Sequence, residues 1–388
     1  MGGAIVNARA AMIEIDGSRG EGGGQLLRSA LALSAWRGRP LRIVNIRATR
    51  SRPGLKAQHL AAVEMVARSC GAVVSGATLH SSTLVFEPGP VRAGDHQAAV
   101  GTAGATALVV QSALPPLWSA RGDSRMRVEG GTHVDWAPSS DYLERVFAPA
   151  VRRLGLALDV QLIRRGFYPR GGGVIEARLA GTSDAGPEDQ PAGEGRARND
   201  RPAREQVRSS RVLHWRAPAR ERIRVEMTGV VSSLPRSIAE RMLGAAREVL
   251  SRGGWRACEE IVETPGPTGT FLFITVSGPP AESSRAGEEG ETIAGGFIAL
   301  GAPGRRAETI AAEAARECLA FLESGAVVDP HLADQLLLPA LVAGVELSFT
   351  TSRVSSHLRS NAGTIEAFLG PCIDVAGDGT VAVRSPAR

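Results

Sequence analysis

One order of secondary structure recurs three times along the chain, and this repeat constrains the fold more than any other feature. Apolar spacing and turn residues predict helix, strand, helix and two further strands in residues 22–86, again in 101–177 and again in 332–383. A supersecondary unit that recurs in this way is expected to bury its apolar faces against the other copies. The sequence therefore predicts an α/β large domain built from three αβαββ units.

A polar stretch interrupts this pattern. Residues 181–210 are rich in Pro, Gly, Arg, Asp and Glu and contain one branched aliphatic residue, Val207. Such a segment cannot offset its ordering entropy, and it is predicted to be a flexible linker. The alternating helices and strands expected in 211–325 then form a smaller inserted α/β domain, while 1–180 and 326–388 form the large domain.

Charge and apolar content limit the class of protein. The net charge of +5 and the isoelectric point near 9.5 mildly favour a polyanionic partner such as nucleic acid. Four scattered cysteines without a C-x-x-C pair fit neither a zinc site nor a disulfide framework. No stretch approaches the roughly 20 apolar residues of a membrane-spanning helix. We expect a soluble, cytoplasmic protein with no membrane partner.

Lysine usage excludes two kinds of nucleotide chemistry. Lys56 is the only lysine, and no Gly-Lys dipeptide occurs, so the chain has no P-loop. Lys56 lies in Gly-Leu-Lys-Ala, which also excludes a ligase that carries the nucleotide on the lysine of a K-x-D-G motif. If the protein handles ATP, the groups available for this are arginine, glycine-rich backbone and a metal ion, with histidine as a further candidate.

The densest local signal is the glycine-rich segment 16–28, with sequence DGSRGEGGGQLLR. It follows a predicted strand and leads into a helix, and backbone N–H groups at a helix N-terminus bind phosphate well. A carboxylate beside a phosphate site, here Glu21, suggests a metal ligand. A plain flexible turn before a helix is the alternative.

A second basic segment follows the next predicted strand. Arg47, Arg50 and Arg52 alternate there, and the following helix carries Gln58 and His59. Arginines in this arrangement can hold phosphate through paired hydrogen bonds. A solvated basic edge and a packed histidine would give the same pattern.

Polar residues near the C-terminus complete the candidates. Asp334 and Gln335 lie at the polar start of an otherwise apolar helix, where Asp334 could equally be a helix cap. His357 lies beyond the last long strand, in what is predicted to be a polar turn, and a lone histidine there is more often a surface residue.

Taken together, these segments resemble the RNA 3′-terminal phosphate cyclase family. The matching motifs are DGSRGEGGGQLLR at 16–28, IRATR at 46–50, RPGL at 52–55, QHL at 58–60, GGTH at 130–133, RGFYPRGGG at 165–173 and HLADQL at 331–336. The resemblance covers nearly the whole chain outside the linker. It implies a large domain of three repeats like those of enolpyruvyl transferases, interrupted by a smaller α/β domain.

The resemblance also implies an activity and its residues. ATP would transfer AMP to His357, the AMP would pass to an RNA 3′-terminal phosphate, and the adjacent 2′-OH would displace it to close a 2′,3′-cyclic phosphate. By the same matching, Glu21 and Asp334 are expected to hold a divalent ion, Mg or Mn. The residues expected to contact nucleotide and phosphate are Arg28, Arg47, Arg50, Gln58, His59, Gln111, Pro138, His331 and Gln335.

His331 departs from the family pattern. Pro138 matches a proline that packs on one face of adenine, but the other face is often covered by tyrosine in the family, and this chain has His331. An imidazole offers less stacking area than a phenol ring.

Two other functions are alternatives to this activity. One is a non-catalytic relative that binds RNA or assists ribosome assembly, which is expected to lack the histidine at 357. The other is an enolpyruvyl transferase, which is expected to need several lysines.

Overall fold

The structure is a computed structural model that describes residues 11–19, 23–181, 211–278 and 290–386. The predicted linker, 181–210, lies outside these residues except for Gly181. In the described part of the chain, no helix has both the length and the apolar character needed to span a bilayer. The four cysteines are free thiols; Cys258 is exposed and the other three are buried.

Three sheets share one strand order, in which the first strand along the chain lies beside the second, and the fourth lies between the second and the third. In this shared order the first two strands pair in parallel and the other two are added antiparallel. The strands of the first sheet are β1 (Ile13–Asp16), β2 (Leu41–Val44), β3 (Val73–Ser75) and β4 (Leu84–Glu87). Those of the second are β5 (Gly94–Ala99), β6 (Asp123–Gly130), β7 (Asp159–Arg164) and β8 (Gly173–Ala180). Those of the third are β9 (Arg211–Arg216), β15 (Val345–Thr350), β16 (Ile373–Val375) and β17 (Thr380–Val383), with β13 (Gly290–Glu291) beside β9.

The four-strand order that the sheets share therefore holds one strand more than the expected αβαββ order, and the third sheet adds β13 as well. The strands not counted in the predicted units are β1, β5 and β9, which precede the first helix of each group. The reason is clearest for β5, whose sequence GDHQAA contains no β-branched or aromatic residue. Its conformation is set by the parallel pairing with β6 rather than by its own strand propensity.

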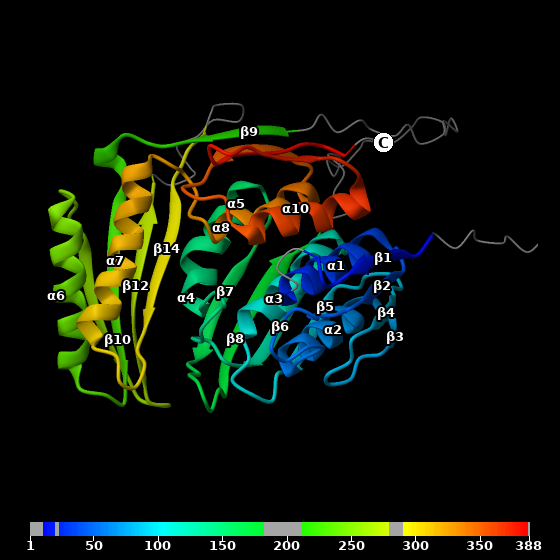
Figure 1. Cartoon of the computed structure of the whole chain (residues 1–388), viewed down its shortest axis with the longest axis horizontal. Helices are drawn as coiled ribbons and strands as arrows, with labels where there is room; N and C mark the ends of the chain where they lie inside the picture. Colours follow the sequence, from blue (N-terminus) through cyan, green and yellow to red (C-terminus); the bar gives the residue numbers. More distant parts are fainter. Residues whose placement is uncertain (1–10, 20–22, 182–210, 279–289, 387–388) are drawn as a thin grey trace, which may run out of the picture.

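The helices that accompany these sheets pack together in the middle of the large unit (Figure 1). They are α1 (Gly24–Arg37), α2 (Ala57–Cys70), α3 (Thr106–Ser119), α4 (Ser140–Tyr142), α5 (Ala148–Arg153), α8 (Leu332–Gln335), α9 (Leu337–Val342) and α10 (Ser356–Leu369), with a π-helical segment η1 (Leu143–Phe147) between α4 and α5. The expected helix 101–114 instead begins at Thr106 and continues through Pro115 and Pro116. Burial of nearly the whole of α3 outweighs the two backbone N–H donors that the prolines lack.

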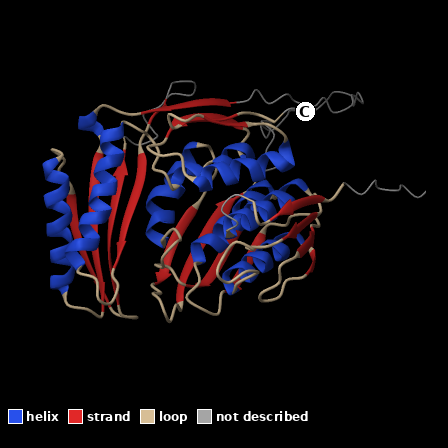
Figure 2. Ribbon diagram, in the orientation of Figure 1, coloured by secondary structure: helices blue, strands red, loops and turns tan. Residues whose placement is uncertain are grey.

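A fourth sheet forms a separate layer (Figure 2). Its order is β11 (Cys258–Thr264), β10 (Arg224–Ser232), β12 (Gly269–Ser277) and β14 (Ala294–Leu300), and α6 (Arg236–Arg252) and α7 (Ala307–Ser324) cover one face. A short 3-10 turn, η2 (Arg220–Arg222), leads into it. Because β9 pairs with β15, the sheets divide after β9 rather than at residue 211.

The strand β12 is buried on both faces, and its alternate residues belong to different cores. Phe271 and Phe273 pack with the large unit, whereas Leu272 and Ile274 pack with α6 and α7. This alternation follows from the two-residue period of a strand. The smaller layer is thus joined to the large unit by an apolar interface, in which β12 and β14 contact the π-helical segment Leu143–Phe147.

Candidate active site

A cavity of about 500 Å³ lies where α1, α3, α8 and α10 meet, and β14 closes one side. One part of its wall is polar and another is apolar and aromatic. The polar side chains include Gln25, Arg28, Ser29, Gln111, Glu317, His331, Asp334, Gln335, His357 and Asn361. The apolar and aromatic side chains include Leu114, Pro115, Trp118, Trp136, Pro138, Phe297 and Ile298. A cavity of this size and mixed lining can hold a nucleotide-sized ligand.

His357 lies on this wall, but not in the polar turn that was predicted, and that prediction is wrong. It is the second residue of α10, whose first turn is capped by the Ser355 hydroxyl accepting from the Leu358 N–H at 3.1 Å. The imidazole Nδ1 lies 2.6 Å from Oε1 of Gln25. Gln25 in turn donates its amide Nε2 to Oδ2 of Asp334.

This chain of contacts selects a tautomer for His357. While Asp334 is ionised, the Gln25 amide nitrogen must face the carboxylate, so its oxygen faces His357 and accepts the Nδ1 proton. In neutral imidazole the lone pair then resides on Nε2. The arrangement can therefore hold His357 as a nucleophile with a defined reacting atom.

Asp334 is a half-buried carboxylate with an unusual acidity. Burial, reinforced by the negative charge of Asp329, raises its pKa from 3.8 to about 7, although the Arg28 guanidinium opposes this shift. Burial also lowers the pKa of Arg28 to about 10, which leaves it cationic at neutral pH. Asn361 donates its side-chain amide to the Asp334 carbonyl at 2.7 Å and accepts from the Ser29 hydroxyl at 2.6 Å, tying α10 to α8 and α1.

Asp334 does not cap its helix. That role belongs to Asp329, whose Oδ1 accepts from the backbone N–H groups of His331 and Leu332 at 2.7 and 3.0 Å. The other oxygen, Oδ2, accepts from the Tyr142 hydroxyl at 2.8 Å and from the Gly296 N–H at 3.1 Å. Asp329 is fully buried and joins α4, β14 and the start of α8 at one point. It thereby sets the position of the segment that carries His331 and Asp334.

The predicted basic residues gather next to the cavity, beside Gly23 and Gly24. A methyl group at Gly24 would lie 2.3 Å from His59 Nε2 and 2.8 Å from an Arg28 nitrogen, so only glycine permits this approach. Burial and the charges of Arg28, Arg47 and Lys56 lower the pKa of His59 to about 3, which makes it a neutral residue. A methyl group at Gly23 would lie 3.3 Å from a guanidinium nitrogen of Arg50. The cluster is suited to an anion.

Arg47 differs in role from the other arginines. It is buried, adopts a left-handed backbone conformation (φ 54°), and donates through one guanidinium nitrogen to the carbonyls of Arg52 and Gly54 at 2.8 and 2.9 Å. Burial and the nearby Arg50 charge lower its pKa. It organises the basic loop and does not line the cavity.

The remaining predicted contacts fall in two places. Gln111, Pro138, His331 and Gln335 line the cavity, and Gln111 donates to the Gln335 side-chain oxygen at 2.5 Å. Gln58 lies outside it and accepts from the Ala105 N–H at 3.3 Å, which fixes the loop before α3. Arg28 lines the cavity and also lies beside Gly24 and His59, so it connects the two groups.

Of the two metal ligands predicted from sequence, the structure describes Asp334. Glu21 lies outside the described residues. In the described part of the chain, no group of three His, Cys, Asp or Glu residues is arranged to hold a metal ion. Asp334 is a single carboxylate, which is compatible with Mg²⁺ because that ion commonly takes most of its ligands from phosphate and water.

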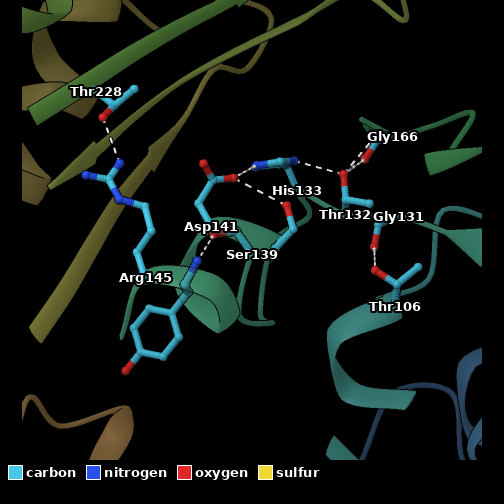
Figure 3. A network of polar contacts seen from close by, with 11 residues as sticks. Thr106, Gly131, Thr132, His133, Ser139, Asp141, Arg145, Gly166 and Thr228 are labelled. Carbon is cyan, nitrogen blue, oxygen red and sulfur yellow. Dashed lines mark hydrogen bonds and ion pairs between the residues drawn. The ribbon is translucent and has the colours of Figure 1, made fainter. Parts of the chain in front are cut away.

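The GGTH motif builds a buried network at the boundary with the smaller layer (Figure 3). His133 contacts the Thr132 hydroxyl at 2.9 Å and Asp141 at 2.6 Å, and its ring stacks on Phe271 with centroids 4.2 Å apart. Burial opposes ionisation of Asp141, but the hydrogen bond and charge of His133 lower its pKa below 3.8. Arg145 reaches across to the Thr228 hydroxyl at 2.8 Å. The motif therefore holds the loop that carries Pro138 against the smaller layer.

Sequence reasoning missed several residues of the site. Gln25, Ser29 and Asn361 have no chemical signature of their own, since amides and hydroxyls are common on helices. A pattern could have identified Gln25, because it follows the glycine run at the first turn of a helix. Asp329, three residues before a predicted helix, carried the sequence signal of a helix cap.

The chain is similar to known proteins over nearly all its length. A family model described as RNA 3′-terminal phosphate cyclase matches residues 19–375. Proteins named RNA 3′-terminal phosphate cyclase are 42% identical in Pseudomonas aeruginosa, over 92% of this chain and 93% of the relative, and 40% identical in Methylococcus capsulatus, over 96% of both. A protein of that name in Salmonella agona is 38% identical over 93% of both chains.

Proposed function

This chain is an enzyme that belongs to the RNA 3′-terminal phosphate cyclase family, and we propose that it uses ATP to convert an RNA 3′-terminal phosphate to a 2′,3′-cyclic phosphate through AMP bound to His357. The observation that carries the proposal is the contact of His357 Nδ1 with Gln25 at 2.6 Å on the wall of the nucleotide-sized cavity. It leaves Nε2 as the atom with the lone pair.

In the first step, Nε2 of His357 attacks the α-phosphorus of ATP. The N–P bond forms, the bond from the α-phosphorus to the bridging oxygen breaks, and pyrophosphate leaves. The geometry favours this step because the imidazole is already oriented by Gln25, which lowers the entropy cost of reaching the reactive arrangement. Arg28, on the same wall, is cationic and can offset phosphate charge.

In the second step, an oxygen of the RNA 3′-phosphate attacks the same phosphorus and releases His357. In the third, the 2′-OH attacks the RNA 3′-phosphorus, the ring closes, and AMP leaves. Both are phosphoryl-type displacements, in which positioning and charge neutralisation supply most of the catalysis.

Other residues of the site support binding rather than bond making. Pro138 and His331 lie on the cavity wall where adenine is expected, and the cluster of Arg50 and Lys56 beside the glycine loop is suited to phosphate oxygens. A divalent ion on Asp334 would add further neutralisation of phosphate charge.

A direct assay tests the proposed function. An RNA oligonucleotide labelled in its 3′-terminal phosphate is incubated with the protein, ATP and Mg²⁺ or Mn²⁺. The label should become resistant to phosphatase while the chain length is unchanged, and no conversion should occur without ATP. A label that stays sensitive to phosphatase under all these conditions would contradict the proposal.

A further inference from the structure

Trp136 stands apart from the other tryptophans of the chain. Its side chain is 100% exposed, whereas Trp118, Trp215 and Trp255 are at most 9% exposed and Trp36 is partly buried. Tryptophan is strongly buried on average because its ring carries a large apolar area. Yet Trp136 lines the cavity that also contains His357. A large ring is thus presented to the site without packing against the protein.

The backbone holds Trp136 in an unfavourable conformation. Its φ of 62° lies in the left-handed region, which bulky residues rarely adopt. The segment is anchored on both sides, by His133 and by the Ser140 N–H, which donates to the Thr132 carbonyl at 3.0 Å. Strained residues of this kind persist where the surroundings over-determine them, and they gather at ligand sites.

The chemistry of the cavity indicates what the ring would contact. Arg28 and His357 supply a side suited to phosphate, and other residues of the lining, among them Pro138 and Phe297, are apolar. A ligand with phosphate at one end and a flat aromatic ring at the other fits both parts. Exposed aromatic side chains bind nucleobases of single strands by stacking, and every base has a suitable face.

We propose that Trp136 is the stacking platform for a nucleobase of the substrates, and that this base is the 3′-terminal base of the RNA. The proposal rests on the proposed function, because Pro138 and His331 are there expected to enclose the adenine of ATP. A second base, on the nucleotide whose 3′-phosphate accepts AMP, then needs its own surface, and Trp136 offers one on the same cavity wall.

Equilibrium binding of RNA tests this assignment without requiring turnover. The variants are Trp136→Ala and Trp136→Phe, with Val73→Ala as a control, since Val73 is exposed but lies on β3 and does not line the cavity. The ligands are a 3′-phosphorylated oligonucleotide and the same oligonucleotide with an abasic terminal nucleotide. Melting curves confirm that each variant folds.

Trp136→Ala should weaken binding of the normal oligonucleotide on the order of tenfold, the effect of removing one base–aromatic stack. It should leave binding of the abasic oligonucleotide unchanged, and Trp136→Phe should retain most of the affinity. ATP is measured in parallel by equilibrium binding. If Trp136→Ala weakens binding of ATP and leaves binding of RNA unchanged, the stacked base is adenine and the assignment to RNA is wrong. Equal affinities of wild type and Trp136→Ala for both ligands would overturn the proposal.

These outcomes remain distinct from a failure of the proposed function. If the protein binds RNA through Trp136 but produces no cyclic phosphate, the stacking proposal stands and the proposed function is wrong. If the Trp136→Ala variant cyclises RNA and binds it with unchanged affinity, the proposed function stands and the stacking proposal is wrong.

Discussion

Two carboxylates lie close together in sequence at α8, Asp329 just before the helix and Asp334 within it. Burial is the largest cause of the raised pKa of each, and in Asp334 the charge of Asp329 adds to it. The fold therefore holds negative charge where it is poorly solvated. Such an arrangement suits a site that receives a cation or an arginine-neutralised phosphate, because the cost is then offset by the ligand.

This arrangement predicts how stability depends on pH. The native state keeps the Asp334 proton up to about pH 7, whereas the unfolded chain loses it near 3.8, so the native state binds more protons in this window. Stability from this group is present at low pH and falls as pH rises from about 4 to about 7.

Asp334→Asn should remove that dependence. The unfolding free energy of the variant relative to wild type, measured by thermal melts, should be higher at pH 8 than at pH 5 by on the order of 1–2 kcal/mol. This is less than the whole shift implies, because the side chain is partly solvated. A constant difference between the two proteins at both pH values would contradict the assignment of Asp334 as a penalised carboxylate.

At the same scale, sequence reasoning could identify residues with distinctive chemistry but not their partners. Arg28, Gln111, Pro138, His331, Asp334, Gln335 and His357 were predicted and do meet on one cavity wall. Their roles remain predictions. Gln25, which contacts both His357 and Asp334, was not predicted, since its contact with His357 joins positions 332 residues apart. Pairings across such distances depend on helix packing, which a single sequence does not display.

The helix α10 positions the proposed nucleophile. Because Ser355 caps it, the first turn begins at Ser356 and His357 is directed toward Gln25 on α1. Asn361, one turn later, fixes the same helix to α8 through the Asp334 carbonyl. The sequence predicted only the last part of this helix, because Ser355, Ser356, Ser360 and Asn361 have low helix propensity. Capping and packing outweigh that propensity here.

Ser355→Ala should separate the cap from the chemistry. Loss of one N-cap hydrogen bond is expected to lower stability by about 1 kcal/mol. Fraying of the first turn should also slow AMP incorporation, while ATP binding, which rests on other helices, stays near the wild-type value. Ser355→Asp, which can also cap, should restore the melting temperature. Unchanged AMP incorporation in a Ser355→Ala variant of lowered melting temperature would contradict the positioning role of this turn.

On the scale of the whole molecule, the cavity exists because two layers meet. The helices α1, α3, α8 and α10 of the large unit supply the polar wall, and β14 of the smaller layer closes the apolar side. Asp329, which contacts Gly296 on β14, and Arg145, which contacts Thr228 on β10, cross this boundary. The site is thus built from segments separated by more than 300 residues.

The sequence predicted a mixed α/β architecture but not where the chain crosses between layers. Short apolar strands such as β2 and β15 can be predicted from their own residues. The place of β9 does not, because a strand with the sequence RVLHWR could join either sheet. Its pairing with β15 is decided by which neighbour buries Trp215, and Phe349 of β15 lies against that ring.

The central claim is that His357 carries AMP, and the adduct itself is the most direct measurement. The protein is incubated with ATP labelled at the α-phosphate or the γ-phosphate, together with a divalent cation, and the modified residue is located by mass spectrometry of the digested chain. The account predicts one AMP on His357 from α-labelled ATP, no label from γ-labelled ATP, and no AMP on a folded His357→Ala variant. AMP on another residue, such as His59, or wild-type uptake of α-label by His357→Ala, would contradict it.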